Sequence, residues 1–115
     1  MTPDDFRRLA LSFPETEERS HMDHPDFRVA GKIFATLSYP DKSSAMVKLT
    51  PDQQAELMHD EPKAFHPCNG AWGRKGATNV RLKSVKKATL HRALEAAWCN
   101  TAPKKLAHSR KSPGA

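Results

Sequence analysis

The sequence has 115 residues, of which 37% are hydrophobic and 28% are charged, and its formal net charge is +6. This length is typical of one domain with a core of its own, and no apolar run approaches the roughly 20 residues that cross a bilayer. The segment Thr2-Pro3-Asp4-Asp5 lacks the basic character of a secretory signal. We therefore expect a monomeric cytoplasmic protein that does not enter a membrane.

The N-terminal segment carries the signals of a helix. Thr2 is a suitable N-cap, Pro3 suits the first helical position, and the two acids that follow face the positive end of the helix dipole. Apolar residues then recur at helical spacing until a proline, which predicts a helix over residues 3–13. Residues 14–23 are polar and predict an irregular acidic loop. A metal site in this loop is disfavoured, because no helical spacing unites its carboxylates.

Apolar and polar residues alternate in three blocks between residues 24 and 49. This period of two is typical of half-buried strands. Gly31 suits a turn with positive φ, and Pro40-Asp41-Lys42-Ser43 combines a proline with side chains that cap turns. The segment predicts a three-stranded antiparallel meander whose inner face needs helices to cover it. The predicted inner-face residues are Phe27, Val29, Ile33, Ala35, Leu37, Val47 and Leu49.

Helical and alternating patterns follow one another in the second half of the chain. They predict a short helix that is capped by Thr50 and ends near His59, with Gln53 completing a capping box. They also predict a long helix that is capped by Ser84 and ends near Asn100. Between these helices we expect, in order, a short strand within residues 62–68, a shaped glycine-rich loop over 70–76 and a strand over 78–83.

These elements predict an α+β fold. A single domain over residues 1–100 would hold an antiparallel sheet of about five strands, with the N-terminal and C-terminal helices packed on one face. From Thr101 the apolar pattern stops, and the remaining residues are mostly polar and basic. Such a segment buries too little apolar surface to offset its ordering entropy. We therefore expect residues 101–115 to form a disordered basic tail.

The sequence contains no motif for catalysis or cofactor binding. Cys68 and Cys99 lack CxxC or Cys-His spacing, and the expected compartment favours reduced thiols. No serine or cysteine lies in a nucleophile elbow, and the glycine-rich loop lacks the spacing of a Walker or dinucleotide motif. We expect a non-enzymatic protein without a metal or cofactor.

Charge is divided unevenly along the chain. Residues 1–62 carry a net charge of −5, and residues 63–115 carry +11. Cations of the second part adjoin Trp72, whose ring could stack on a base while they meet phosphates. DNA binding is the first hypothesis, through Trp72, Arg74, Lys75, Arg81, Lys83, Lys86 and Lys87. Two alternatives remain open: the cations form an ordinary solvated face, and Trp72 plugs one end of the core while neighbouring glycines let the chain turn.

A second hypothesis is a small-molecule or protein interaction domain with a pocket near His24, Lys48 and Trp72. His24 precedes a proline at the start of the meander, and Lys48 points away from its apolar neighbours in the alternating pattern. The alternatives are that His24 hydrogen-bonds its loop and that Lys48 belongs to a solvated face.

Several motifs occur along the chain in a characteristic order: Glu15, His24-Pro25-Asp26-Phe27-Arg28-Val29, Gly31-Lys32-Ile33-Phe34-Ala35-Thr36, Val47-Lys48-Leu49, Gly70-Ala71-Trp72-Gly73, Gly76-Ala77-Thr78 and Ala96-Ala97-Trp98. In these motifs the chain resembles the MmcQ/YjbR family over about residues 2–100. The resemblance implies a small CyaY-like α/β domain, in an intracellular bacterial protein without a settled enzymatic role or cofactor. Family members are commonly labelled DNA-binding, from a fold likened to paired wing motifs.

The resemblance has one departure and one weaker implication. Ala77 is small, whereas a large residue often follows the preceding glycine in this family. The fold analogy also suggests a frataxin-like role in iron handling. The first helix disfavours that role, because Asp4 and Asp5 do not continue into a long acidic ridge.

Overall fold

The protein is built on a six-stranded antiparallel sheet with the strand order β1-β2-β3-β4-β6-β5. The computed structural model describes residues 1–39 and 41–111, with side chains up to His108. The expected meander is confirmed as the three neighbouring strands β2, β3 and β4. The strands are β1 (Thr16–His21), β2 (His24–Val29), β3 (Lys32–Leu37), β4 (Ser44–Lys48), β5 (Phe65–Pro67) and β6 (Ala77–Arg81).

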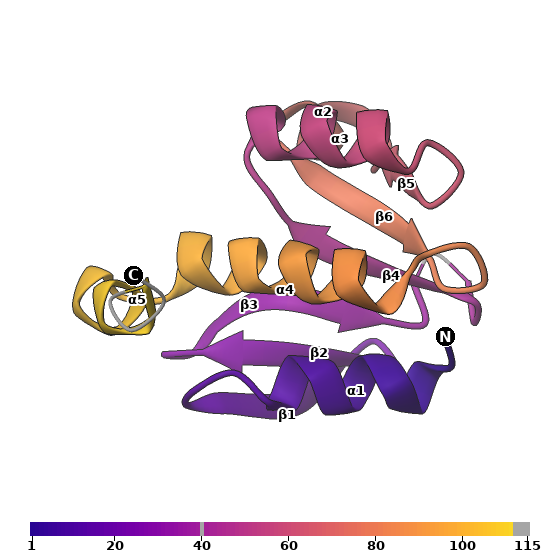
Figure 1. The fold of residues 1–115 in the computed structure, drawn as a ribbon. Helices are drawn as coiled ribbons and strands as arrows, with labels where there is room; N and C mark the ends of the chain where they lie inside the picture. The colour runs from indigo at the N-terminus through magenta and orange to yellow at the C-terminus, as the bar shows by residue number, and fades with distance from the viewer. Residues whose placement is uncertain (40, 112–115) are drawn as a thin grey trace.

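Helices from both ends of the chain cover one face of this sheet. In Figure 1, α1 (Pro3–Leu11) and the long α4 (Lys87–Thr101) cross the same side of the sheet, which confirms the predicted α+β arrangement. The predicted capping boxes at Thr2 and Thr50 are present, and they start α1 and α2 (Pro51–Asp60).

The main core lies between these helices and the sheet. All the predicted inner-face residues of the meander are buried except Ile33, which is half-buried. Alternation in and just after β6 is also as expected, because Val80 and Leu82 are buried while Arg81 is exposed. Trp98 of α4 is fully buried, and its indole Nε1 donates a hydrogen bond to the carbonyl oxygen of Pro14 at 3.1 Å.

Strand β1 lies where the sequence predicted an acidic loop, so that prediction is wrong. β1 is an edge strand in which Thr16 is half-buried and the other five residues are exposed, so it shows no apolar alternation. Its backbone pairs with β2 along its whole length. The two-residue turn between them, Met22-Asp23, has φ values of 49° and 66°. These left-handed values are typical of tight hairpins, but neither residue is the glycine or asparagine that signals one.

Two details of the second half also differ from the prediction. The glycine-rich stretch expected as a loop contains a short helix, α3 (Gly70–Arg74). Ser84 does not cap α4, whose N-cap is Lys86 without a side-chain hydrogen bond. The reason is a turn after β6, in which the N–H groups of Ser84 and Val85 both donate to the carbonyl oxygen of Arg81.

Part of the predicted disordered tail is helical, so the boundary at residue 100 is wrong for this segment. α5 (Lys104–Lys111) follows α4, with Ala102 and Ala107 buried and Leu106 packed against the core. These few apolar contacts are too sparse to form a visible helical pattern among the lysines. Residues 112–115 lie outside the described residues. In the described part of the chain, no helix is long and apolar enough to cross a bilayer.

Candidate functional site

The face of the sheet opposite α1 and α4, here called the outer face, carries the polar positions of the strands. One row of cross-strand partners contains a residue from every strand: Arg19, Asp26, Thr36, Met46, Asn79 and His66. Asp26 and Met46 are fully buried and Thr36 is 4% exposed. Met46 packs with Cys68 and Ala77 in a small apolar cluster separate from the main core. The outer face is therefore partly covered.

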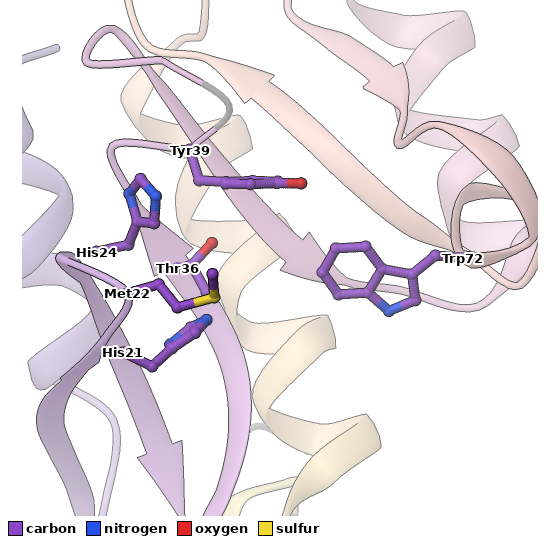
Figure 2. Close-up of a pocket in the computed structure, with 6 residues that line it drawn as sticks. All are labelled: His21, Met22, His24, Thr36, Tyr39 and Trp72. Atoms are coloured by element: carbon purple, nitrogen blue, oxygen red, sulfur yellow. The ribbon is translucent and has the colours of Figure 1, made fainter.

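A pocket of about 280 Å³ opens on the outer face. His21, Met22, His24, Thr36, Tyr39 and Trp72 line it. Figure 2 shows Trp72 projecting from α3 toward this space, with Tyr39, Met22 and His21 on the side of the meander and β1. The described large hydrophobic side chains that are exposed include Met22 (85%), Tyr39 (39%) and Trp72 (43%), and all three line this pocket.

Two buried contacts hold α3, and with it Trp72, against the sheet. A Cβ on Gly73 would lie 1.7 Å from the carbonyl oxygen of Cys68, so only glycine allows this approach. The side-chain amide of buried Gln54 donates to the carbonyl oxygens of Gly73 at 3.0 Å and Ala77 at 3.1 Å. Gly73 therefore serves a close backbone approach, which differs from the predicted alternative of a chain turn around a core-plugging Trp72. Trp72 does not plug the core, because its side chain stands exposed at the pocket.

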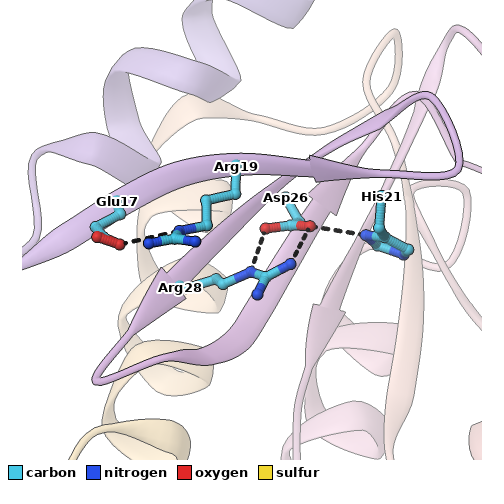
Figure 3. Close-up of polar contacts among 5 residues, drawn as sticks. All are labelled: Glu17, Arg19, His21, Asp26 and Arg28. Carbon is cyan, nitrogen blue, oxygen red and sulfur yellow. Dashed lines mark hydrogen bonds and ion pairs between the residues drawn. The ribbon is translucent and has the colours of Figure 1, made fainter.

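A buried carboxylate organises the wall of the pocket near β1 and β2. Asp26 accepts hydrogen bonds from Arg28 Nε at 2.8 Å and Arg28 Nη2 at 3.1 Å, and it lies 2.7 Å from His21 Nδ1, as Figure 3 shows. The bonds from Arg28, followed by that from His21, lower the pKa of Asp26 and outweigh the opposing effect of burial. An ionised carboxylate only accepts, so Nδ1 of His21 carries a proton. Nε2 of His21 lies on the ring edge away from Asp26.

Two other polar groups of the pocket have no hydrogen-bond partner. Thr36 Oγ1 and His24 Nδ1 are buried and unpaired within the described structure. The His24 ring meets the Tyr39 ring edge-on, with centroids 5.5 Å apart and an interplanar angle of 82°. His24 thus contacts an aromatic residue of the pocket wall. The sequence analysis also allowed a hydrogen bond from His24 to its own loop, and Nδ1 does not form one in the described structure.

The predicted pocket residues do not all come together. His24 and Trp72 line the same pocket, whereas Lys48 lies in a separate groove with Arg28, Lys32 and Asn100. The backbone carbonyl of Lys48 accepts a hydrogen bond from Asn100 Nδ2 at 3.1 Å. Thr36 and Tyr39 were missed as site residues, although a threonine inside an otherwise apolar strand was a visible signal.

The predicted DNA-contacting cations are all exposed, but they lie in two groups. Arg74 and Lys75 precede β6 and lie beside Trp72 in sequence. Arg81, Lys83, Lys86 and Lys87 lie at and beyond the other end of β6, which is about 13 Å away at the usual strand rise.

The surroundings of the second group are partly acidic. The backbone N–H of Lys86 donates to Glu61 Oε1 at 3.2 Å, and Lys87 borders a cavity with Asp5. Arg81 lies close enough to Asp41 to contribute, after the hydrogen bonds from Ser43 and Ser44, to a lowered pKa of that carboxyl. The two groups therefore differ in how freely their charge is available.

The described residues include a buried thiol and no cluster of possible metal ligands. Both cysteines are free, and burial raises the pKa of Cys68 to about 11, which keeps this thiol protonated and unreactive. Within residues 1–39 and 41–111, no group of three or more His, Cys, Asp or Glu side chains could hold a metal ion. The arrangement is suited to binding through aromatic rings and hydrogen bonds.

Comparisons with known proteins agree with the architecture. Residues 11–100 match the family model described as YjbR. Among solved structures, the chain is similar to the crystal structure of Deinococcus radiodurans protein DR2400, family-model domain DUF419, with a TM-score of 0.71. The sequence identity is 20%, and the match covers 86% of this chain and 77% of that chain. At this identity the likeness shows the fold alone. No curated protein matches the sequence.

Proposed function

This chain belongs to the YjbR family, and we propose that it is a non-enzymatic DNA-binding protein that holds a single strand on its outer face. The observation that carries the proposal is the pair of exposed aromatic side chains, Trp72 and Tyr39, in one pocket on that face. Proteins that bind single strands combine such rings with cations that follow the backbone. We further propose that the protein acts as a cytoplasmic monomer.

Cations flank the pocket on the path that such a strand would take. Arg74 and Lys75 lie next to Trp72 in sequence, and Arg81 lies on the outer-face side of β6 at its far end. None of the three takes part in an ion pair among the described residues. We assign phosphate contacts first to these three residues. Lys83, Lys86 and Lys87 lie beyond them and would add longer-range attraction.

The salt dependence of binding tests this assignment. Three phosphate contacts to a single strand give a slope of log K against log salt of about −2, whereas all six cations together would give about −4. Fluorescence anisotropy of labelled single-stranded and duplex DNA, from low to physiological salt, measures both slope and strand preference. We expect tighter binding of the single strand.

A charge-matched pair of variants separates specific contacts from net charge. Substituting Arg74 and Lys75 together by alanine should remove most of the slope. Substituting Lys104 and Lys105 of α5 removes the same formal charge elsewhere and should change binding little. Equal losses from the two variants, or no binding by the wild type at physiological salt, would refute the proposal.

A second candidate function is a small-molecule or protein interaction domain at the pocket of His24 and Trp72. The unpaired, buried Thr36 Oγ1 favours it, because such a group gains a partner when a ligand enters. A thermal-shift panel of anionic metabolites tests it, since a ligand specific to the native state raises the melting temperature. A shift with one metabolite and none with DNA would favour this second function.

A further inference from the structure

The outer-face pocket has features that point to one class of ligand. We propose that it takes a single nucleobase-sized heteroaromatic ring, with the ring's edge hydrogen-bonded inside and any attached phosphate outside. The inference deepens the proposed function where the ring is an unpaired base of a DNA strand. A free nucleoside presents the same ring chemistry.

Size limits what can enter. The pocket volume is about 280 Å³, near the lower limit of roughly 300 Å³ for ordinary ligand sites. A single planar ring system suits such a volume, whereas a dinucleotide cofactor or a folded peptide does not.

The walls provide flat, apolar surfaces for a ring. Tyr39 is contacted edge-on by His24, and Figure 2 shows Trp72 reaching the space from a different element. Met22, in the tight turn between β1 and β2, adds a flexible thioether at the pocket mouth, where its side chain is 85% exposed.

Polar groups inside the pocket suit the edge of a base. Thr36 is 4% exposed, its Oγ1 has no partner, and Figure 2 shows this oxygen directed into the space bordered by Tyr39 and Met22. A hydroxyl both donates and accepts, and Nε2 of His21, on the ring edge away from Asp26, is a second polar atom of the lining. Nucleobases carry neighbouring donors and acceptors along one edge, so they can satisfy both groups.

The charge of the lining separates the ring from its phosphate. None of the six lining residues is Lys or Arg, and Asp26, the charged side chain bonded to them in the described structure, is itself held by Arg28. An anion would therefore find no Lys or Arg inside the pocket. Arg74 follows Trp72 by two positions and is exposed, so a phosphate attached to a ring against Trp72 has a cation available outside.

Tryptophan fluorescence reads the site directly. Trp98 is buried and distant in the fold from the outer face, so a change in signal on adding ligand reports Trp72. The probes are thymidine, adenosine, a single-stranded homo-oligonucleotide and an abasic oligonucleotide of the same length. We expect the nucleosides and the normal oligonucleotide to quench the fluorescence. The abasic strand should bind about tenfold or more weakly and should not quench it, because each stacked base contributes substantially to affinity.

A matched pair of threonine variants tests the hydrogen bond. Thr36→Val removes the unpaired hydroxyl from the pocket at nearly constant shape, and we expect several-fold weaker nucleoside binding with an unchanged or raised melting temperature. Thr16→Val removes another buried, unpaired hydroxyl that does not line the pocket. It should leave nucleoside affinity unchanged.

The outcomes distinguish this inference from the proposed function. If the abasic strand binds as tightly as the normal one and no nucleoside quenches, the pocket does not take a base, while DNA binding through phosphates stands. If nucleosides quench but neither strand binds, the pocket assignment stands with a free nucleoside as its source, and the DNA function falls. Wild-type nucleoside affinity in Thr36→Val would overturn the assigned hydrogen bond and with it the inference.

Discussion

The two faces of the sheet differ in what their buried residues do. On the face covered by α1 and α4, here called the helix face, most buried residues are apolar and pack against one another, as Phe6 and Phe27 do with ring centroids 5.8 Å apart. On the outer face, buried Asp26 is bonded to partly exposed groups, and the hydroxyl of buried Thr36 has no partner among the described residues. The helix face thus supplies stability, whereas the outer face retains features that lower it. Such features are typical of binding sites.

The helix face should be the more sensitive to truncation. Phe27→Ala removes a fully buried ring from the core and should lower the free energy of unfolding by about 4 kcal/mol. Chemical denaturation measures this loss. If Phe27→Ala lowered the free energy of unfolding by less than an outer-face variant does, the contrast between the two faces would be reversed.

Asp26 is a fully buried charged residue of the outer face. Asp26→Asn should cost about 3 kcal/mol at neutral pH, because it leaves Arg28 without its buried partner. The lowered pKa of Asp26 means that its contribution is complete above the ordinary carboxyl pKa of about 3.9. The contribution is lost as the pH falls through the lowered native value. The difference between wild type and variant should therefore narrow below about pH 4.

A neighbouring surface pair provides the control for Asp26. Glu17 and Arg19 form an ion pair at 3.2 Å with both side chains more than half exposed, as Figure 3 shows. Glu17→Gln should change the free energy of unfolding by no more than about 0.5 kcal/mol. Denaturation of both variants between pH 2 and 8 compares them, and a pH-independent effect of Asp26→Asn would contradict the assigned ion pair.

Gln54 connects the helix that carries Trp72 to the rest of the fold. Gln54→Leu removes donors from the carbonyl oxygens of Gly73 and Ala77 and should cost about 2 kcal/mol. DNA binding should weaken with it, because α3 loses its anchor. Glu56→Leu places the same side chain on the exposed side of α2 and should affect neither property. Unchanged stability of Gln54→Leu would show that glycine packing alone positions α3.

Trp72 should show the smallest effect on stability and a clear effect on binding. Trp72→Ala alters a side chain that is 43% exposed and should change the free energy of unfolding by no more than about 0.5 kcal/mol. Loss of stacking should weaken single-strand binding about tenfold, and Trp72→Phe should restore most of it. Anisotropy and thermal melting measure the two effects. Strong destabilisation would instead make Trp72 a core residue.

Local signals predicted much of the helix face. The caps at Thr2 and Thr50 and the alternation of Val80 with Leu82 depend on neighbours within a few positions, so they are visible in the sequence. β1 was missed because an exposed edge strand is held by backbone pairing, which any side chain permits. The short helix α3 was missed because its position depends on a buried hydrogen bond from Gln54, which lies 19 residues from Gly73 in the chain.

The candidate site was only partly predictable. Trp72 and His24 were predicted as pocket residues, and both line the pocket. The alternating pattern could not reveal that Tyr39 lines the same pocket or that Lys48 lies in another groove. The seven residues predicted to contact DNA were grouped because they are near in sequence, whereas β6 separates them into two sets. Side chains alternate between the two faces of the sheet along each strand, so the face of a residue is visible in the sequence. Its neighbours on other strands depend on the register in which the strands pair.

The sequence by itself determined the α+β class, the capped helices and the apolar face of the meander, since these depend on short-range periodicity, and its ordered motifs carried the resemblance to the family. Tertiary structure decided the sixth strand, the packing of α5 and the pocket. That pocket joins a hairpin turn at Met22, a strand residue at Thr36 and a helix residue at Trp72. These residues meet only because strands distant in the chain pair in one register and Gln54 holds α3 beside them.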